Sequence, residues 1–139
     1  MENVLIIGGS RFMGPLLTEK LLSKGYGLTV FNRGNIKSQY NKKIKFIRGD
    51  RNNGFANIKD KYDIVVDMCS YNGIQTEKAI NELKFDFFIH ISTAAAYKKP
   101  QAVPLTELSP IGDWPLWGSY NKGKVECEKV LRESRIKYA

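Results

Sequence analysis

Short apolar runs alternate with amphipathic segments along most of the chain. Residues 4–7 are apolar at every position, which is typical of a strand buried on both faces of a parallel sheet. After them, Met13, Leu17 and Leu21 recur every four residues and predict a helix with these side chains on one face. Strands that alternate with helices in this way predict an α/β doubly wound fold. The same pattern predicts further strands at residues 28–31, 44–47, 64–66 and 85–92, and further helices at residues 74–83 and 120–134.

The segments between these elements carry turn-forming residues and helix caps. Asn72 is placed to cap the helix that begins at residue 74. The stretch at residues 52–54 begins a segment that is too short to predict as a helix. A proline-rich loop precedes the last helix, and we expect its tryptophans, Trp114 and Trp117, to pack that loop rather than to line a pocket.

Length and composition indicate one domain of a soluble protein. The 139 residues suffice for a single core, and 42% of them are hydrophobic. The chain has no apolar run of the roughly 18 residues that cross a membrane and no signal-peptide pattern, so we predict a cytoplasmic protein. Cys69 and Cys127 are expected to be reduced thiols, with neither a disulfide nor a metal site. His90, the only histidine, lies in a predicted buried strand and is expected to be a core residue.

The formal net charge of +8 is open to two interpretations. A basic protein attracts phosphates, whether of a cofactor, a nucleotide sugar or a nucleic acid. Lysine-rich surfaces are also common where the side chains are merely solvated. Because the lysines form no single stripe along the sequence, we favour the solvated surface.

A glycine-rich turn connects the first predicted strand to the first predicted helix. A dinucleotide-binding turn needs residues without a Cβ, because its backbone must bend sharply and approach a pyrophosphate at the helix N-terminus. Gly14 would also let the helix pack closely on the sheet. An ordinary strand–helix turn is the alternative, since a glycine cluster alone is a weak signal. The residues of the turn are Gly8, Gly9, Ser10, Arg11, Phe12, Met13 and Gly14.

Two further strand ends carry polar residues that bear on the cofactor. NAD-binding domains often have an acid after the second strand for the ribose hydroxyls, and this chain has Asn32 followed by Arg33. The asparagine removes a charge that would repel a 2′-phosphate and the arginine can pair with one, so NADP is favoured over NAD, although Arg33 could equally be a solvated loop residue. After the third strand, Asp50 and Arg51 lie where a carboxylate could bind an adenine amino group, and an Asx turn explains Asp50 nearly as well.

A tyrosine and a lysine lie four residues apart on the last predicted helix. Tyr120 and Lys124 therefore share a face of that helix. An ammonium close to a phenol stabilises the phenolate, which allows the tyrosine to exchange a proton with a substrate hydroxyl or carbonyl. Thr93 follows the fifth strand, at the sheet edge where ligands of α/β folds bind, and its hydroxyl could orient the same substrate oxygen. Such a pair also occurs by chance on exposed helices, so its weight depends on Thr93 and on the fold.

Together these features resemble the short-chain dehydrogenase/reductase superfamily. Within it, the chain resembles the extended NAD-dependent epimerase/dehydratase family, which includes UDP-glucose 4-epimerase. The resemblance implies a Rossmann-like sheet of strand order 3-2-1-4-5 in three α/β/α layers, formed by residues 1–139 without the C-terminal strands and the substrate domain. Residues 135–139 resemble the start of a sixth strand, so the chain is interpreted as a fragment. The stretches that match occur in the family's order at residues 4–14, 31–34, 49–50, 91–97 and 120–124.

By this resemblance the site residues take the family's roles. Tyr120 matches the catalytic tyrosine, Lys124 the lysine that also holds the nicotinamide ribose, and Thr93 the catalytic serine or threonine. The outer glycines of the family's turn are present, whereas Arg11 replaces the middle one, which suits NADP but could also narrow the site. The residues that match cofactor-lining positions after the third and fourth strands are Asp50, Asp67, Met68 and Cys69.

The function that the resemblance implies is an NAD(P)-dependent epimerase, dehydratase or reductase acting on a nucleotide sugar. Tyr120 would remove a proton from a sugar hydroxyl while a hydride passes to the nicotinamide. Without a substrate domain, the fragment is expected to bind the dinucleotide but to turn over substrate poorly. The resemblance is compatible with a homodimer, and no membrane partner is expected.

The alternative is a catalytically weak RNA-binding or regulatory module. The basic charge and the Gly-Gly-Ser-Arg-Phe turn resemble those of RNA-binding members of the superfamily. The intact set of Thr93, Tyr120 and Lys124 argues against this alternative, so a nucleic-acid partner is not favoured.

Overall fold

The chain divides into two compact units in the computed structural model, which describes residues 2–36, 43–99, 103–112, 116 and 118–139. Unit 1 consists of Met1–Cys69, Lys78–Ile91 and Ile136–Ala139, and unit 2 consists of Ser70–Glu77 and Ser92–Arg135. Trp114 and Trp117, which the sequence assigns to loop packing, lie outside the described residues. None of the described helices is long and apolar enough to cross a membrane.

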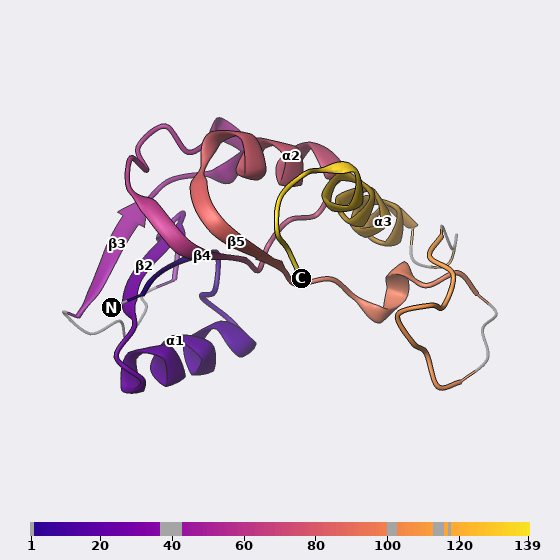
Figure 1. The fold of residues 1–139 in the computed structure, drawn as a ribbon, viewed down its shortest axis with the longest axis horizontal. Helices are drawn as coiled ribbons and strands as arrows, with labels where there is room; N and C mark the ends of the chain where they lie inside the picture. Colours follow the sequence, from indigo (N-terminus) through magenta and orange to yellow (C-terminus); the bar gives the residue numbers. More distant parts are fainter. Residues whose placement is uncertain (1, 37–42, 100–102, 113–115, 117) are drawn as a thin grey trace. The chain divides into compact units, whose positions relative to one another are not determined.

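A five-stranded parallel sheet forms the centre of unit 1 (Figure 1). The strands are β1 (Asn3–Ile7), β2 (Gly27–Asn32), β3 (Ile44–Arg48), β4 (Lys61–Asp67) and β5 (Lys84–His90). Their order is β3-β2-β1-β4-β5, so the predicted doubly wound topology is confirmed. Because all neighbouring pairs are parallel, the carboxyl ends of the strands meet at one edge of the sheet.

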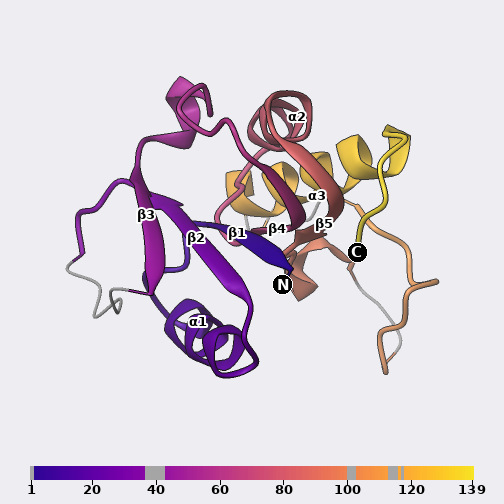
Figure 2. The ribbon, with the colours of Figure 1, turned by 60° about the vertical axis from the view of Figure 1, so that its left-hand side comes forward.

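Helices cover both faces of this sheet (Figure 2). On one face, Val4 and Ile6 of β1 belong to a buried cluster against which Leu17 and Leu21 of α1 (Met13–Ser23) pack. On the other face, the ring of Phe31 lies 5.1 Å from that of Phe55. The C-terminal half of α2 (Gly73–Glu82) belongs to unit 1 and lies on the opposite side of the sheet from α1 (Figure 1). Unit 1 therefore has the helix–sheet–helix layers that the resemblance implied.

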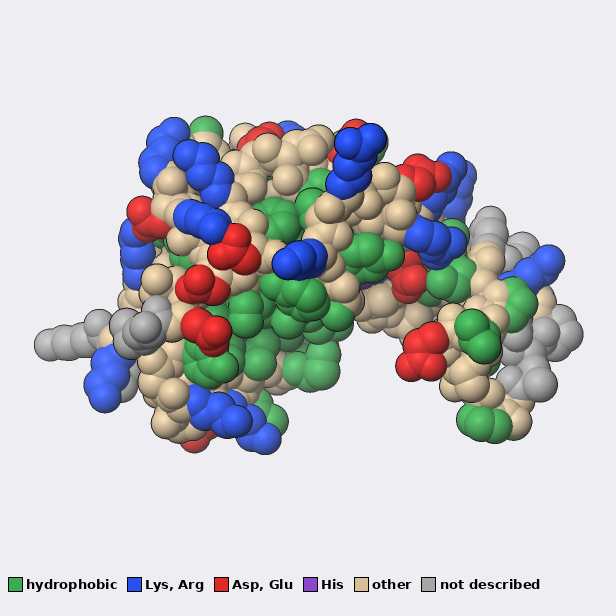
Figure 3. Space-filling model, in the orientation of Figure 1, with side chains coloured by type: hydrophobic (Ala, Val, Ile, Leu, Met, Phe, Trp, Pro, Cys, Tyr) green, Lys and Arg blue, Asp and Glu red, His purple; other side chains and the backbone are tan. Residues whose placement is uncertain are grey.

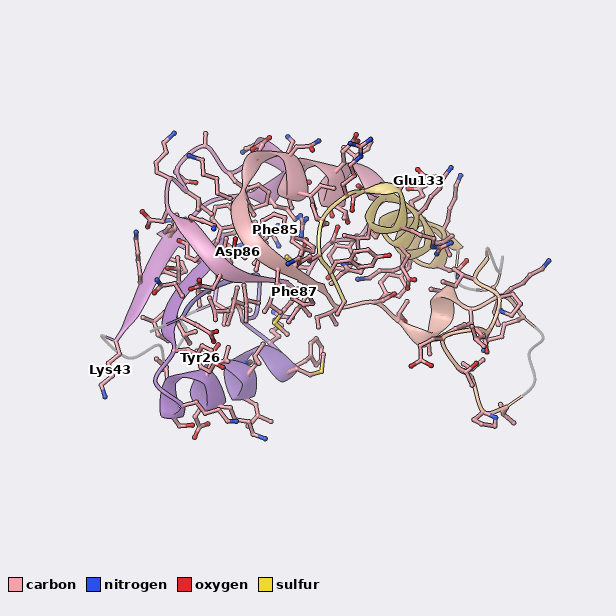
Figure 4. The ribbon with its side chains drawn as sticks, in the orientation of Figure 1. Tyr26, Lys43, Phe85, Asp86, Phe87 and Glu133 are labelled. Carbon is pink, nitrogen blue, oxygen red and sulfur yellow. The ribbon has the colours of Figure 1, made fainter. Side chains whose placement is uncertain are left out.

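The α1 side of β4 and β5 is only partly covered. Ile64, Phe87 and Ile89 point to this side and are half-buried. Figure 3 shows hydrophobic side chains at the surface between β5 and α1, and Figure 4 labels Phe85, Asp86 and Phe87 along β5. The apolar side chains of β5 are thus fully buried on one face of the sheet and half-buried on the other.

Four details differ from or extend the prediction for unit 1. The fifth strand ends at His90 rather than at residue 92, although Ile91 still donates a backbone hydrogen bond to Asp67 at 3.0 Å. Met13 is 57% exposed and lies outside the core that Leu17 and Leu21 contact. A short 3-10 helix, η1 (Arg51–Asn53), forms where the sequence predicted no helix, because Asp50 caps it. Residues 136–139 add one parallel bridge beside β5, as the predicted sixth strand would.

Unit 2 is organised around α3 (Gly118–Glu133). The predicted core residue Cys127 is fully buried, and Leu131 is buried with it. The first residues of α2 also belong to unit 2, where the side chain of Asn72 accepts a hydrogen bond from the backbone of Gln75 at 2.9 Å. The predicted helix cap is confirmed.

Candidate functional site

The glycine-rich turn of unit 1 adopts a conformation that depends on its glycines. Gly8 and Gly9 have φ of +88° and +74°, in the region where a Cβ is strained. A Cβ on Gly14 would lie 2.0 Å from the carbonyl oxygen of Gly9, so the turn folds back directly onto the first turn of α1. A Cβ on Gly8 would lie 2.8 Å from the Sγ of Cys69, which follows β4. The turn after β1 is therefore packed against the turn after β4, and both lie at the carboxyl edge of the sheet.

The N-terminus of α1 has the features of an anion site. Its N-cap residue, Phe12, makes no side-chain hydrogen bond to the helix, and the first turn contains no acidic residue. The first N–H groups of a helix carry partial positive charge and need an acceptor. Their position next to a glycine turn is the arrangement that binds the pyrophosphate of a dinucleotide.

The non-glycine residue at positive φ in this turn, Phe12, is not the one that departs from the family's glycine pattern. Phe12 has φ of 53° and is 94% exposed, so it carries backbone strain without packing in return. Arg11, at the family's middle glycine, is exposed and is not among the residues with positive φ. The replacement of glycine by Arg11 is therefore compatible with the backbone of the turn.

The turn after β2 is tied to the glycine turn by Asn32. Its Nδ2 donates to the carbonyl oxygen of Gly8 at 3.4 Å, and its Oδ1 accepts from the backbone of Gly34 at 2.8 Å. Arg33, between them, is exposed. At the end of β3, Asp50 accepts a hydrogen bond from the backbone of Asn52 at 2.9 Å, which is the Asx turn that the sequence left as an alternative to adenine binding.

Arg51 and Asp67 form a buried ion pair in unit 1. The two nitrogens Nη1 and Nη2 of Arg51 donate to the two carboxylate oxygens of Asp67 at 2.6 and 2.9 Å. Burial alone would lower the pKa of Arg51, but the hydrogen bonds and the charge of Asp67 outweigh it and raise that pKa. Arg51 also lies 3.6 Å from the Sγ of Cys69.

This pair gives a structural role to residues that the sequence assigned to the cofactor. Asp67 is fully buried and Arg51 is 7% exposed, so their charged groups bind each other at the carboxyl edge of the sheet. Met68 and Cys69 are half-buried beside them. That Arg51, Asp67, Met68 and Cys69 contact the cofactor stays a prediction. The ion pair of Arg51 with Asp67 fixes the turn from which such contacts would be made.

A second tyrosine, Tyr71, lies beside both members of the tyrosine–lysine pair of unit 2. The ammonium of Lys124 lies 5.8 Å from the ring centroid of Tyr71, and the ring centroid of Tyr120 lies 6.2 Å from the same ring. Both side chains therefore lie on the side of α3 that contacts Tyr71, as their spacing predicted. Lys124 is 3% exposed and Tyr120 is 42% exposed, so the lysine is buried whereas solvent or a substrate can reach the tyrosine.

Two glycines bring Tyr71 to this helix. A Cβ on Gly123 would lie 1.9 Å from the carbonyl oxygen of Tyr71, so the backbones of α3 and of the 70–73 turn touch there. A Cβ on Gly73 would lie 3.2 Å from the Cβ of Glu126. Tyr71 was not predicted from the sequence. The signal for its contact with the helix was the glycine inside the Tyr-Asn-Lys-Gly-Lys stretch.

Thr93 is held near the start of α3 by hydrogen bonds within unit 2. Its Oγ1 accepts from the backbone of Ala95 at 3.3 Å and caps η2 (Ala94–Ala96). The fully buried side chain of Asn121, next to Tyr120, donates to the carbonyl oxygen of Ala95. Ser92 donates to Glu128 of α3 as well. Asn121 was also missed from sequence, because its partners are backbone groups of a loop.

The two units carry different chemical features. Unit 1 presents a glycine turn and a helix N-terminus suited to a pyrophosphate. Unit 2 presents a phenol with a buried ammonium and a threonine hydroxyl on segments that hydrogen bonds join. A turn of the first kind suits a dinucleotide, and a phenol of the second kind is chemically able to exchange a proton with a hydroxyl or carbonyl group.

The family assignment follows from comparison with known proteins. The model of the NAD-dependent epimerase/dehydratase family matches residues 4–139. The chain belongs to this family. The expectation from sequence is confirmed, and the match extends over both units.

Two relatives of similar sequence have names that state different functions. The chain is 26% identical to the chloroplast stem-loop binding protein of 41 kDa b from Arabidopsis thaliana, over 99% of this chain and 40% of that protein. It is 25% identical to UDP-glucose 4-epimerase from Lactobacillus helveticus, over 92% of this chain and 46% of that enzyme. The chain therefore spans less than half the length of these curated relatives.

A solved enzyme shares the fold. The structure of WbmG from Bordetella bronchiseptica in complex with NAD matches with a TM-score of 0.79 at 20% identity, over 99% of this chain and 51% of that chain. A second structure of WbmG contains NAD and UDP. The chain spans about half of this enzyme as well.

Proposed function

We propose that this chain is the dinucleotide-binding part of an NAD(P)-dependent enzyme that epimerises or dehydrates a nucleotide sugar. The observation that carries the proposal is the turn between β1 and α1, where Gly8 and Gly9 have positive φ and Gly14 leaves no room for a Cβ. Such a turn before a helix without a side-chain cap suits a pyrophosphate. The nicotinamide of the bound cofactor supplies the hydride chemistry.

The protein's own contribution to the reaction is proton transfer and orientation. Tyr120 is exposed, so in its phenolate form it can take the proton of a sugar hydroxyl, and the phenol so formed can return that proton to a carbonyl. Lys124 is buried one helical turn further along α3, and we assign it as the partner of Tyr120 in this role. The Thr93 hydroxyl caps η2 with its lone pair and keeps its O–H to donate to the same sugar oxygen.

A nucleotide sugar is the proposed substrate because the relatives point to that class. One relative is named for UDP-glucose, and WbmG has been solved with UDP. Because the chain spans about half of these proteins, we expect it to bind the cofactor and to turn over substrate slowly. Turnover by this chain at the rate of a complete epimerase would contradict the expectation that it binds the cofactor but turns over substrate slowly.

Replacing Tyr120 with phenylalanine tests the proton-transfer role. We expect Tyr120→Phe to slow the reduction of NAD(P)⁺ by a UDP-hexose by about 100-fold or more, since a general acid/base contributes on that scale. The measurement is absorbance at 340 nm with the protein in excess over cofactor, so that slow single turnovers are visible. Cofactor affinity should not change.

Tyr138→Phe is the matched control, because it removes the hydroxyl of another exposed tyrosine. It should leave the rate as in the wild type. An unchanged rate in Tyr120→Phe would contradict the assignment of the acid/base.

The choice between NAD and NADP is proposed from the turn after β2. Asn32 and Arg33 replace the acid that would bind the ribose hydroxyls of NAD, which favours NADP. WbmG, in contrast, was solved with NAD.

RNA binding is a second candidate function. One specific observation favours it: a relative matched over 99% of this chain is named as a stem-loop binding protein. A filter-binding assay with a stem-loop RNA over a salt series separates the candidates. Nanomolar affinity with a steep salt slope would support RNA binding, and weak binding would leave the enzyme proposal.

A further inference from the structure

The net charge of the protein comes from one segment. Residues 20–49 contain eight basic residues and no acidic one, whereas the rest of the chain contains fourteen of each. The excess positive charge is therefore carried by residues 20–49 of the sequence, contrary to the interpretation of scattered lysines. The eight residues are Lys20, Lys24, Arg33, Lys37, Lys42, Lys43, Lys45 and Arg48.

At the carboxyl end of β2, Asn32 stands where a side chain would recognise a ribose, and its amide is already hydrogen-bonded within the protein. Both ends of the Asn32 amide are bound, one to the backbone of Gly34 at 2.8 Å and the other to the carbonyl oxygen of Gly8 at 3.4 Å. Recognition of the 2′- and 3′-hydroxyls of NAD depends on a carboxylate at this place. Asn32 instead fixes the turn after β2 beside the glycine turn, and it brings no negative charge.

Arg48 of β3 reaches over the same turn. It is in register with Asn32, and its Nε donates to the carbonyl oxygen of Arg33 at 3.1 Å. Gly34 has φ of +70°, and a Cβ there would lie 3.6 Å from the Cδ and Nε of Arg48. The guanidinium of Arg48 is therefore anchored through one nitrogen, and Nη1 and Nη2 remain to bind a ligand.

No carboxylate neutralises this pair of arginines within the described residues. The ion pairs there involve Lys45, Arg51, Lys61 and Lys129, and neither Arg33 nor Arg48 takes part in one. Two exposed guanidinium groups on adjacent strand ends form a site for a doubly charged phosphomonoester, because arginine donates paired N–H groups to phosphate oxygens.

We propose that Arg33 and Arg48 together bind the 2′-phosphate of NADP, which makes Arg48 a specificity-determining residue of the cofactor site. The proposal rests on the proposed function, because the glycine turn must hold the pyrophosphate for the adenosine ribose to reach the end of β2. Arg48 lies 15 residues beyond Arg33 in the sequence, and the parallel pairing of β2 with β3 brings the two together.

Calorimetric titration of the wild-type chain and of Arg48→Gln tests this assignment. The ligands are NADP⁺ and NAD⁺, together with adenosine 2′,5′-bisphosphate and 5′-AMP, which differ by the 2′-phosphate alone. In the wild type, each ligand with a 2′-phosphate should bind about tenfold or more tightly than its partner, the size of one charge-assisted contact. Arg48→Gln should lose about tenfold in affinity for the 2′-phosphorylated ligands and nothing for the others.

Lys43→Gln is the control for charge. It removes the same charge from the same segment, but Lys43 precedes β3 and lies at the other end of the strand, roughly 16 Å from Arg48 by the rise of a strand. Figure 4 labels it there. This variant should bind all four ligands as the wild type does.

Three outcomes overturn the proposal. Equal binding of NAD⁺ and NADP⁺ would remove the 2′-phosphate site and leave the proposed dinucleotide function standing. An equal loss of affinity in Arg48→Gln and Lys43→Gln would show that the overall positive charge of the segment, and not Arg48 itself, is responsible. Binding of none of the ligands, by a chain with a folded far-UV spectrum, would remove both the site and the proposed function.

Discussion

At the scale of single residues, Arg51 and Asp67 determine how the carboxyl edge of the sheet is held. Arg51 follows β3, and its guanidinium crosses to the last residue of β4 with two hydrogen bonds. The sequence placed both residues at the cofactor. It could not show their pairing, because Arg51 is brought to Asp67 by the path of η1 and not by local spacing. A buried ion pair is costly to break, since the remaining charge loses its partner in a place that water does not reach.

Removing one partner of this pair should destabilise unit 1. We expect Asp67→Asn to lower the free energy of unfolding by about 3–5 kcal/mol, the range for a buried pair that loses one member. The measurement is urea unfolding followed by circular dichroism. Lys45→Gln is the control, because it breaks an exposed pair with Asp60 and should change stability little. An Asp67→Asn chain as stable as the control would contradict the role of the pair.

The same pair predicts a pH dependence through Arg51. Its pKa is raised, because the hydrogen bonds and charge of Asp67 outweigh desolvation. The stabilisation from its positive charge is therefore fully present below the ordinary pKa of arginine and is lost only as the pH rises through the raised value. The stability difference between the wild type and the double variant Arg51→Met, Asp67→Asn, in which neither partner is left to titrate, should stay constant between about pH 6 and pH 9. A difference that shrinks across this range would contradict a permanently charged Arg51.

At the scale of elements, close backbone contacts decide how α3 presents its side chains. The carbonyl oxygen of Tyr71 occupies the space where a side chain at residue 123 would be. This contact brings the ring of Tyr71 to both Lys124 and Tyr120. A helix pattern alone places the tyrosine and the lysine on one face, but it gives no information about which turn crosses that face.

Gly123→Ala should disrupt this arrangement. A Cβ 1.9 Å from a backbone oxygen forces the helix or the turn to move, and overpacking of this kind costs about 1–3 kcal/mol. Thermal unfolding followed by circular dichroism measures the loss. Lys122→Ala, an exposed position one residue earlier on α3, should leave stability nearly unchanged. Equal melting temperatures for the two variants would show that the contact is not close in solution.

The strands were predictable from sequence because each contains a short stretch of apolar positions, as in residues 4–7, and their order was implied by the family resemblance. Predictable too were the glycine turn and the face shared by Tyr120 and Lys124. What could not be predicted was contact between segments distant in sequence, such as Asn121 with the carbonyl oxygen of Ala95. These contacts depend on loop paths, for which a single sequence contains no periodic signal.

At the scale of the whole molecule, the charge and the family assignment indicate the same kind of ligand. The chain belongs to a family named for its dependence on NAD, and its excess positive charge lies in residues 20–49, which include the turn after β2. The lysines alone show no pattern. The concentration of positive charge in residues 20–49 becomes clear only when the absence of acidic residues from that segment is considered together with its lysines and arginines.

The central claim is that the glycine turn of unit 1 binds a dinucleotide. Isothermal titration calorimetry of the folded chain with NAD⁺, NADH, NADP⁺ and NADPH tests it most directly, with a far-UV spectrum to verify folding. We predict saturable one-to-one binding of at least one pair of these cofactors, and its loss in Gly14→Ala, whose Cβ would meet the carbonyl oxygen of Gly9 at 2.0 Å. The absence of binding by any of the four cofactors in a folded wild-type chain would contradict the claim.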